Sequence, residues 1–140
     1  MTDRLPPERR SWLMSRVRSS DTRPEMTVRS ALHALGFRYR LHQKDLPGTP
    51  DLVFRSRNKV VFVHGCFWHG HHCRLGQAAS KSNVEFWADK IRRNVARDRR
   101  NITALRRQGW GVAVVWECEL KKRMGDKWIL RIIRFLERQA

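Results

Sequence analysis

The segment from Val60 to Cys73 places the strongest constraint on how this chain can fold. Its first four residues form an apolar run with the length of a buried strand, and the run stops abruptly at His64. Residues 64–73 then hold four histidines, two cysteines and two large aromatic side chains. Because this loop is so rich in metal ligands and proton acceptors, we expect a chemically active site at the end of that strand.

The charge of the chain indicates what kind of molecule such a site acts on. The sequence has 30 Lys and Arg against 13 Asp and Glu, a net charge of +17, and the excess is spread along its length. A reactive cluster on so basic a protein favours chemistry on nucleic acid. An acidic membrane surface is the rival polyanion, but no apolar segment is long enough to cross a bilayer. Residues 1–10 lack the apolar core of a signal peptide, so we expect a cytoplasmic protein with no membrane association.

The hydrophobic pattern predicts an α/β fold in a single globular domain. Helices are expected to begin near Pro24 and stop at Gly36, to cover residues 84–108, and to cover residues 127–139. Strands are expected over residues 37–41, 51–54, 60–63 and 110–116. The second and third of these form a hairpin around the polar turn 55–59. Residues 8–18 are predicted to be a basic arm or short helix, and residues 76–82 a loop.

The three cysteines and one histidine suggest a metal site. In a reducing compartment cysteines are better interpreted as ligands or buried thiols than as disulfides. The set Cys66, His71, Cys73 and Cys118 has the ligand types of a structural zinc site and leaves no cysteine over. His72 could replace His71, since spacing alone barely separates them.

A second set of residues is suited to acid–base and metal chemistry. Asp51 opens one predicted strand and His64 ends the next, so both should lie at one edge of the sheet, where a carboxylate can hold Mg²⁺. His64 or His69 could remove a proton from water near neutral pH. Asp98 could orient one of them or pair with a neighbouring arginine. Glu25 could serve water or metal, or simply complement a helix dipole.

Apolar side chains in a loop with little core to fill suggest contact with DNA bases. Phe67 and Trp68 are placed to enter between base pairs and unstack them. Trp87 could stack beside them or pack over the loop, and Met14 on the basic arm could act as a second wedge. Arginines crowd residues 92–107, where some should meet phosphates.

These motifs together resemble the very short patch repair (Vsr) endonucleases of bacteria. The central match runs from His64 through Gly65, Cys66, Phe67 and Trp68 to His69, and continues to Cys73. Further matching segments are residues 10–14, 21–25, 46–51, 85–100 and 109–118. The likeness spans about residue 10 to residue 120, and its central motif is highly specific.

The resemblance implies a restriction-endonuclease-like fold, a mixed sheet flanked by helices with a structural zinc site. Residues 1–20 would be a basic N-terminal arm and residues 21–140 a single endonuclease domain. The implied activity is Mg²⁺-dependent nicking of one strand of double-stranded DNA beside the thymine of a T:G mismatch, which arises when 5-methylcytosine deaminates. Mismatch-repair proteins are candidate partners, and we expect a monomer.

The resemblance also implies a role for each candidate residue. Asp51 and the backbone of Val63 would bind Mg²⁺, and His69 would be the general base. The supporting catalytic residues would be His64, Glu25 and Asp98. The zinc ligands would be Cys66, His71, Cys73 and Cys118. The DNA-binding residues would be Met14, Phe67, Trp68, Trp87, Lys90 and Asn94.

Two other functions are considered for the same sequence. One is a related nickase or restriction-like nuclease with different specificity. The other is a zinc-stapled DNA-binding module without activity, although mere binding needs neither Asp51 nor the paired histidines. Val63 stands where a threonine is usual in the family, and Gly70 interrupts a run of histidines, which we expect to loosen that loop.

Overall fold

The first described helix shows how closely local sequence sets the fold. A computed structural model describes residues 21–73 and 84–138. Helix α2 (Arg23–Ala34) begins at Thr22, whose hydroxyl accepts a hydrogen bond from the backbone N–H of Glu25 at 3.3 Å. Pro24 lies in its first turn, where the missing N–H costs nothing. The left-handed Gly36 (φ +95°) follows its end, as predicted.

The sheet has four strands in the order β1-β2-β3-β4. The strands are β1 (Arg40–Leu41), β2 (Leu52–Phe54), β3 (Lys59–His64) and β4 (Gly111–Trp116). The first three are antiparallel, and β4 runs parallel to β3, so the sheet is mixed as predicted. The hairpin is confirmed: it turns through a short 3-10 helix, Arg55–Arg57, and a left-handed Asn58 (φ 54°).

One predicted strand is shorter than expected. Only Arg40 and Leu41 of the segment 37–41 pair with β2, opposite Val53 and Leu52. The partner strand turns into a 3-10 helix directly after Phe54, so Phe37 and Arg38, which this register would place opposite residues 56 and 55, have no extended chain to pair with. Phe37 is instead buried in the core.

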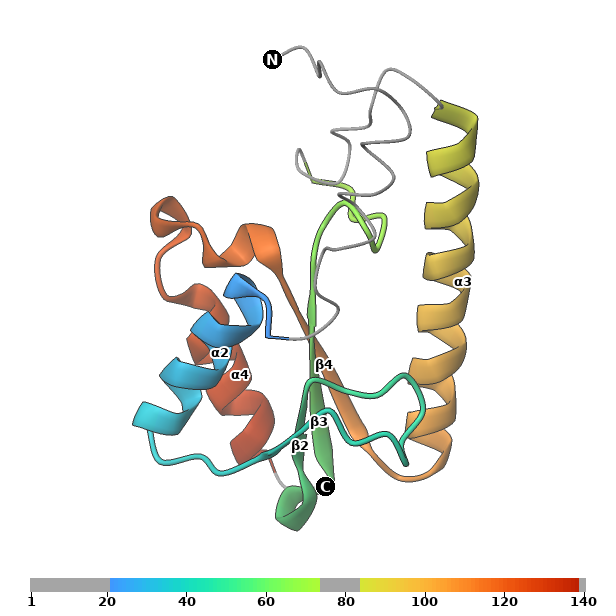
Figure 1. Cartoon of the computed structure of the whole chain (residues 1–140). Coiled ribbons are helices and arrows are strands. Elements are labelled where there is room, and N and C mark those ends of the chain that lie inside the picture. Colours follow the sequence, from blue (N-terminus) through green and yellow to red (C-terminus); the bar gives the residue numbers. More distant parts are fainter. Residues whose placement is uncertain (1–20, 74–83, 139–140) are drawn as a thin grey trace.

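Helices cover both faces of the sheet, as Figure 1 shows. Helices α2 and α4 (Lys127–Glu137) lie on one face, and the long helix α3 (Val84–Arg107) lies on the other. The two cores are correspondingly separate. The core under α2 and α4 is built from Val28, Leu32, Leu52, Phe54, Val61, Ile132 and Leu136, among others. The core under α3 is built from Leu46, Val53, Val60, Phe62 and Leu105.

The topology gathers several chain segments at one end of the sheet. Strands β3 and β4 are parallel with His64 opposite Trp116, so both end together. Asp51 immediately precedes the antiparallel β2 and therefore lies at the same end. The N-terminal half of α3 extends past this end beside the loop that follows His64 (Figure 1).

Some sequence predictions concern residues that the structure does not describe, and the predicted domain boundaries are not tested by it. The basic arm, Met14 and the predicted loop 76–82 lie outside the described residues. The domain boundaries stay a prediction. None of the helices in the described part of the chain is long and apolar enough to cross a membrane.

Candidate functional site

Asp51 is held at the end of β2 by the neighbouring strand. Its Oδ2 accepts a hydrogen bond of 2.7 Å from the backbone N–H of Val63. Burial and the adjacent carboxyl of Glu25 raise the pKa of the Asp51 carboxyl to about 7, against the lowering effect of that hydrogen bond. A buried pair of carboxyls therefore forms a position where added positive charge is favourable.

Glu25 reaches this position from α2 and is almost completely buried, with 1% of its surface exposed. Its Oε2 lies 2.8 Å from His42 Nε2 and 3.3 Å from Arg29 Nη1. Its Oε1 accepts a hydrogen bond of 3.2 Å from the backbone N–H of Asp21. Helix-dipole complementation, considered from sequence, holds as well, because Glu25 lies in the first turn of α2. That effect alone does not account for its burial beside Asp51.

The second part of the site is a stacked pair of histidines. The rings of His64 and His69 lie 3.7 Å apart between centroids with an interplanar angle of 3°. His69 Nδ1 lies 2.6 Å from Asp98 Oδ2 on α3. From sequence, either a histidine or a neighbouring arginine could be the partner of Asp98. His69 is the closer of the two, since Arg97 Nη2 lies 4.0 Å from Asp98 Oδ1.

The two stacked rings differ in their electrostatic environment. His64 is 5% exposed, and burial, together with the neighbouring His69, lowers its pKa to about 3, so it is neutral. Among the described residues, its Nδ1 has no hydrogen-bond partner. Burial acts to raise the pKa of the Asp98 carboxyl, but the hydrogen bond and charge of His69 outweigh it and the pKa is lowered. A charged Asp98 thus fixes the orientation of His69 through Nδ1, so Nε2 is the ring nitrogen that could accept a proton.

The loop that carries His69 packs tightly on α3. Gly70 has a positive φ of +63°, and a Cβ there would lie 2.8 Å from Val95 Cγ2 and 2.9 Å from Ile91 Cγ2. The expectation that Gly70 loosens the loop is therefore wrong: glycine permits its close approach to the helix. A cavity beside Gly70 is lined by His64, His69, Asp98 and Trp116, among others.

The four residues predicted as a metal site come together beyond the histidine pair. One ligand atom from each of Cys66, His71, Cys73 and Cys118 lies within 4.8 Å of the others, so the set could hold a metal ion. The structure places His71, and not His72, in this set. Trp116 stacks on His71 at 4.2 Å and meets the edge of His64 at 5.1 Å, so it joins the cysteine cluster to the stacked histidines.

The aromatic residues form a cluster at the outer end of the sheet. Phe67, Trp68 and Trp87 lie 5.3 to 5.8 Å apart in edge-to-face pairs. Trp87 is 6% exposed. This confirms the prediction that it packs over the loop, which is one of two roles considered for it. The Lys90 ammonium lies 5.5 Å from the Trp68 ring, and Asn94 Nδ2 donates a hydrogen bond of 3.0 Å to the carbonyl of Trp68.

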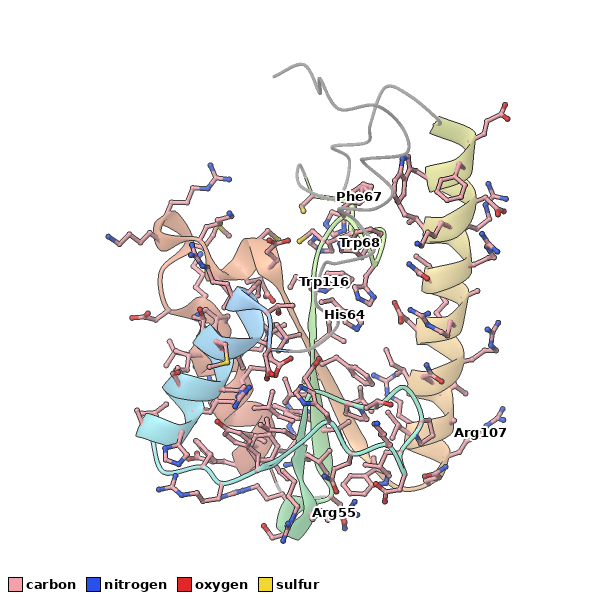
Figure 2. The ribbon with its side chains drawn as sticks, viewed as in Figure 1. Arg55, His64, Phe67, Trp68, Arg107 and Trp116 are labelled. Carbon is pink, nitrogen blue, oxygen red and sulfur yellow. The ribbon has the colours of Figure 1, made fainter. Side chains whose placement is uncertain are left out.

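Figure 2 shows Phe67, Trp68, Trp116 and His64 at one end of the sheet, while Arg55 marks the hairpin at the other. Sequence reasoning missed several residues that shape this end: His42, Arg29 and Trp116. His42 follows Leu41, which pairs with Leu52, so the antiparallel register could have placed it beside Asp51. The contacts of Arg29 follow from its place one turn after Glu25 on α2.

Known proteins of one family are similar to this chain in sequence. The family model described as DNA mismatch endonuclease Vsr matches residues 2–75. The chain is 64% identical to Type II nicking enzyme V.XorIIP of Xanthomonas oryzae pv. oryzae, over 86% of this chain and 88% of the relative. It is 47% identical to Type II nicking enzyme V.NmeAIP of Neisseria meningitidis, over 88% and 87% respectively. It is also 44% identical to DNA mismatch endonuclease Vsr of Escherichia coli, over 81% and 72%. On its sequence, its central motif and these matches, the chain belongs to the Vsr family of DNA mismatch endonucleases.

Proposed function

We propose that this protein nicks one strand of double-stranded DNA beside the thymine of a T:G mismatch produced by deamination of 5-methylcytosine. One observation carries the proposal: His69, oriented by Asp98 at 2.6 Å and stacked on a neutral His64, lies at the same end of the sheet as the Asp51 carboxyl. A positioned base beside a carboxylate suited to a metal ion is what phosphodiester hydrolysis requires. The family name supports the mismatch as substrate.

The carboxyl pair is suited to a hard cation. Asp51, with the backbone carbonyl of Val63, would hold Mg²⁺, and Glu25 would face the same position. The raised pKa of Asp51 supports this assignment, because a buried carboxyl beside a second carboxyl gains stability from an added cation. When bound, Mg²⁺ supplies charge stabilisation at the scissile phosphate and the leaving oxygen. A backbone ligand at Val63 is available whatever the side chain, so valine in place of threonine is compatible with this role.

In the proposed mechanism the proton transfer falls to His69. Its Nδ1 is engaged by Asp98, so its Nε2 accepts the proton of the attacking water. His64 fixes the plane of that ring by stacking on it. Because burial keeps His64 neutral, it adds no positive charge that would lower the basicity of His69.

Zinc is the metal proposed for the cysteine cluster. Three thiols and one imidazole are the donor set of a closed structural site, and their spacing of at most 4.8 Å suits tetrahedral coordination. A zinc ion bound there would hold the loop from Cys66 to Cys73 against Cys118 just past β4, and so keep His69 in place.

DNA recognition is assigned to the outer aromatic cluster and to α3. We propose that Phe67 and Trp68 enter the duplex beside the mismatch, with Trp87 behind them and Met14 on the other side. Lys90, 5.5 Å from the Trp68 ring, would contact the mismatched bases. Asn94 is given the same role, although its side chain is engaged with the Trp68 carbonyl in this structure. Mismatch-repair proteins as partners, and a monomeric state, remain part of the proposal.

Nicking of a related site is the second candidate function, since two of the relatives above are named as Type II nicking enzymes. The test is a strand-resolved nicking assay on T:G, T:A, C:G and other mismatched duplexes, with and without Mg²⁺, across several flanking sequences. Cleavage beside the thymine of T:G only, and only with Mg²⁺, supports the proposal. Cleavage of other duplexes favours the related nickase. Binding without cleavage in any arm would reduce the protein to a DNA-binding module.

A further inference from the structure

We propose that His42 is a positioning residue that holds both carboxyls of the Asp51–Glu25 pair in register. The inference rests on the proposed function of that pair as the divalent-cation site. His42 comes from neither of the elements that carry these carboxyls, because it follows β1, whereas Glu25 lies on α2 and Asp51 precedes β2. It makes one contact to each residue of the pair: its main chain contacts Asp51 and its ring contacts Glu25.

The main chain of His42 binds the backbone of Asp51. Its N–H donates a hydrogen bond of 3.3 Å to the Asp51 carbonyl, directly after the pairing of Leu41 with Leu52. At this point the chain adopts φ +47°, a left-handed conformation that is uncommon for residues other than glycine. Non-glycine residues persist in such conformations where the surroundings fix them, and these positions cluster at functional sites.

The left-handed conformation brings the ring of His42 back to α2. Its Nε2 lies 2.8 Å from Glu25 Oε2, the same oxygen that Arg29 contacts at 3.3 Å. The Glu25 carboxyl is buried, so the groups that contact it set its orientation. The His42 side chain itself is only 24% exposed. His42 therefore joins the carboxylate on α2 to the strand connection that bears Asp51.

Losing this contact should disturb the cation site more than the fold. Arg29 and the Asp21 N–H still hold Glu25 when His42 is replaced, so the helix should remain in place. The carboxyl keeps its side-chain contact with Asp51 but loses the ring contact that ties it to the segment whose main chain binds that of Asp51. Partners that orient metal-binding carboxylates typically change metal affinity or activity by about 10–100-fold when they are removed.

Two substitutions at this position separate the ring contact from the backbone. His42→Asn keeps a residue that tolerates positive φ but is too short to reach Glu25. His42→Gln keeps the reach and an N–H donor. His33→Asn, an exposed position on α2, is the matched control. Each zinc-loaded variant is compared with the wild type for its Mg²⁺ dependence of nicking, its affinity for mismatched DNA without Mg²⁺, and its melting temperature.

We expect His42→Asn to raise the Mg²⁺ concentration for half-maximal nicking by about 10–100-fold while DNA affinity is unchanged. His42→Gln should recover most of the loss, and His33→Asn should behave as wild type. Equal Mg²⁺ dependence in His42→Asn and wild type overturns the inference. So does a loss in His42→Asn that appears equally in DNA affinity, because that would indicate a purely structural role.

A direct binding measurement keeps this test independent of the proposed reaction. Mn²⁺ is titrated into the DNA-free, zinc-loaded protein, and free Mn²⁺ is followed by electron paramagnetic resonance. We expect His42→Asn to bind Mn²⁺ about tenfold or more weakly than the wild type and the His33→Asn control. If the wild type binds Mn²⁺ but nicks no duplex, the proposed function fails while the role of His42 is still decided. Equal Mn²⁺ affinity, or no Mn²⁺ binding by the wild type, overturns the inference.

Discussion

The neutral variant Asp51→Asn should stabilise the cation-free protein at alkaline pH. The wild-type carboxyl lies beside that of Glu25, and its pKa is raised from 3.8 to about 7. A carboxyl whose pKa is higher in the folded state stabilises the fold below its unfolded pKa, and this contribution is lost as the pH rises through the folded pKa. Wild-type stability should therefore fall relative to Asp51→Asn from about pH 4 upward, and the difference should be complete above pH 7.

The size of the effect follows from the shift. About three pKa units correspond to roughly 4 kcal/mol, and part of this belongs to the pair with Glu25 rather than to Asp51 alone. We therefore expect a gain of about 1–4 kcal/mol at pH 8. For a domain of this size that raises the melting temperature by roughly 3–12 °C. The asparagine can still accept the hydrogen bond from Val63, and its amide can donate to Glu25.

Thermal melts followed by circular dichroism at pH 5 and pH 8, in buffer without added Mg²⁺, test this expectation. Asp45→Asn is the matched control, because that carboxyl is exposed and its ion pair is with an exposed Arg55. The stabilised Asp51→Asn protein should be inactive in nicking. If Asp51→Asn melts at or below the wild type at pH 8, or if the difference does not grow between pH 5 and pH 8, the buried carboxyl pair is misdescribed.

Two further substitutions test the loop that carries the histidines. Gly70→Ala should destabilise the protein and slow nicking, because its Cβ would collide with Val95 and Ile91. Gly109→Ala is the control: it has the same cost of a positive φ (+92°), but its Cβ would meet no atom within 4 Å. Equal melting temperatures for the two variants would show that the contact with α3 is not the cause of the destabilisation. Cys118→Ser should lower both the zinc content and the melting temperature, since metal binding is coupled to folding. A full zinc content with an unchanged melting temperature would show that the cluster is not a structural zinc site.

Local signals in the sequence were sufficient for much of the fold. The start of α2 at Thr22 and its stop at Gly36 follow from capping chemistry, and the hairpin follows from two apolar runs around a polar turn. The strand expected over residues 37–41 failed because its length depends on where the partner β2 ends. Pairing length is a tertiary property that periodicity in one segment does not contain.

The candidate site shows the same division. The gathering of Asp51, His64 and Cys118 at one end of the sheet could be predicted, because strand direction decides it. The partner of Asp98 could not, since the sequence offers both histidines and neighbouring arginines, and the packing of α3 against the loop is what brings His69 close. The proposed positioning role of His42 depends on its left-handed backbone conformation, which the local sequence does not predict.

In the proposed mechanism His69, oriented by Asp98, is the base that activates water for strand cleavage. Single-turnover nicking of a T:G duplex at saturating Mg²⁺ tests it most directly, with wild type and His69→Ala compared at equal DNA occupancy. General-base catalysis contributes roughly 10²–10⁴-fold, so the rate should fall by about that factor while affinity for the mismatch is kept. A His69→Ala protein that nicks within a few fold of the wild-type rate would contradict the account.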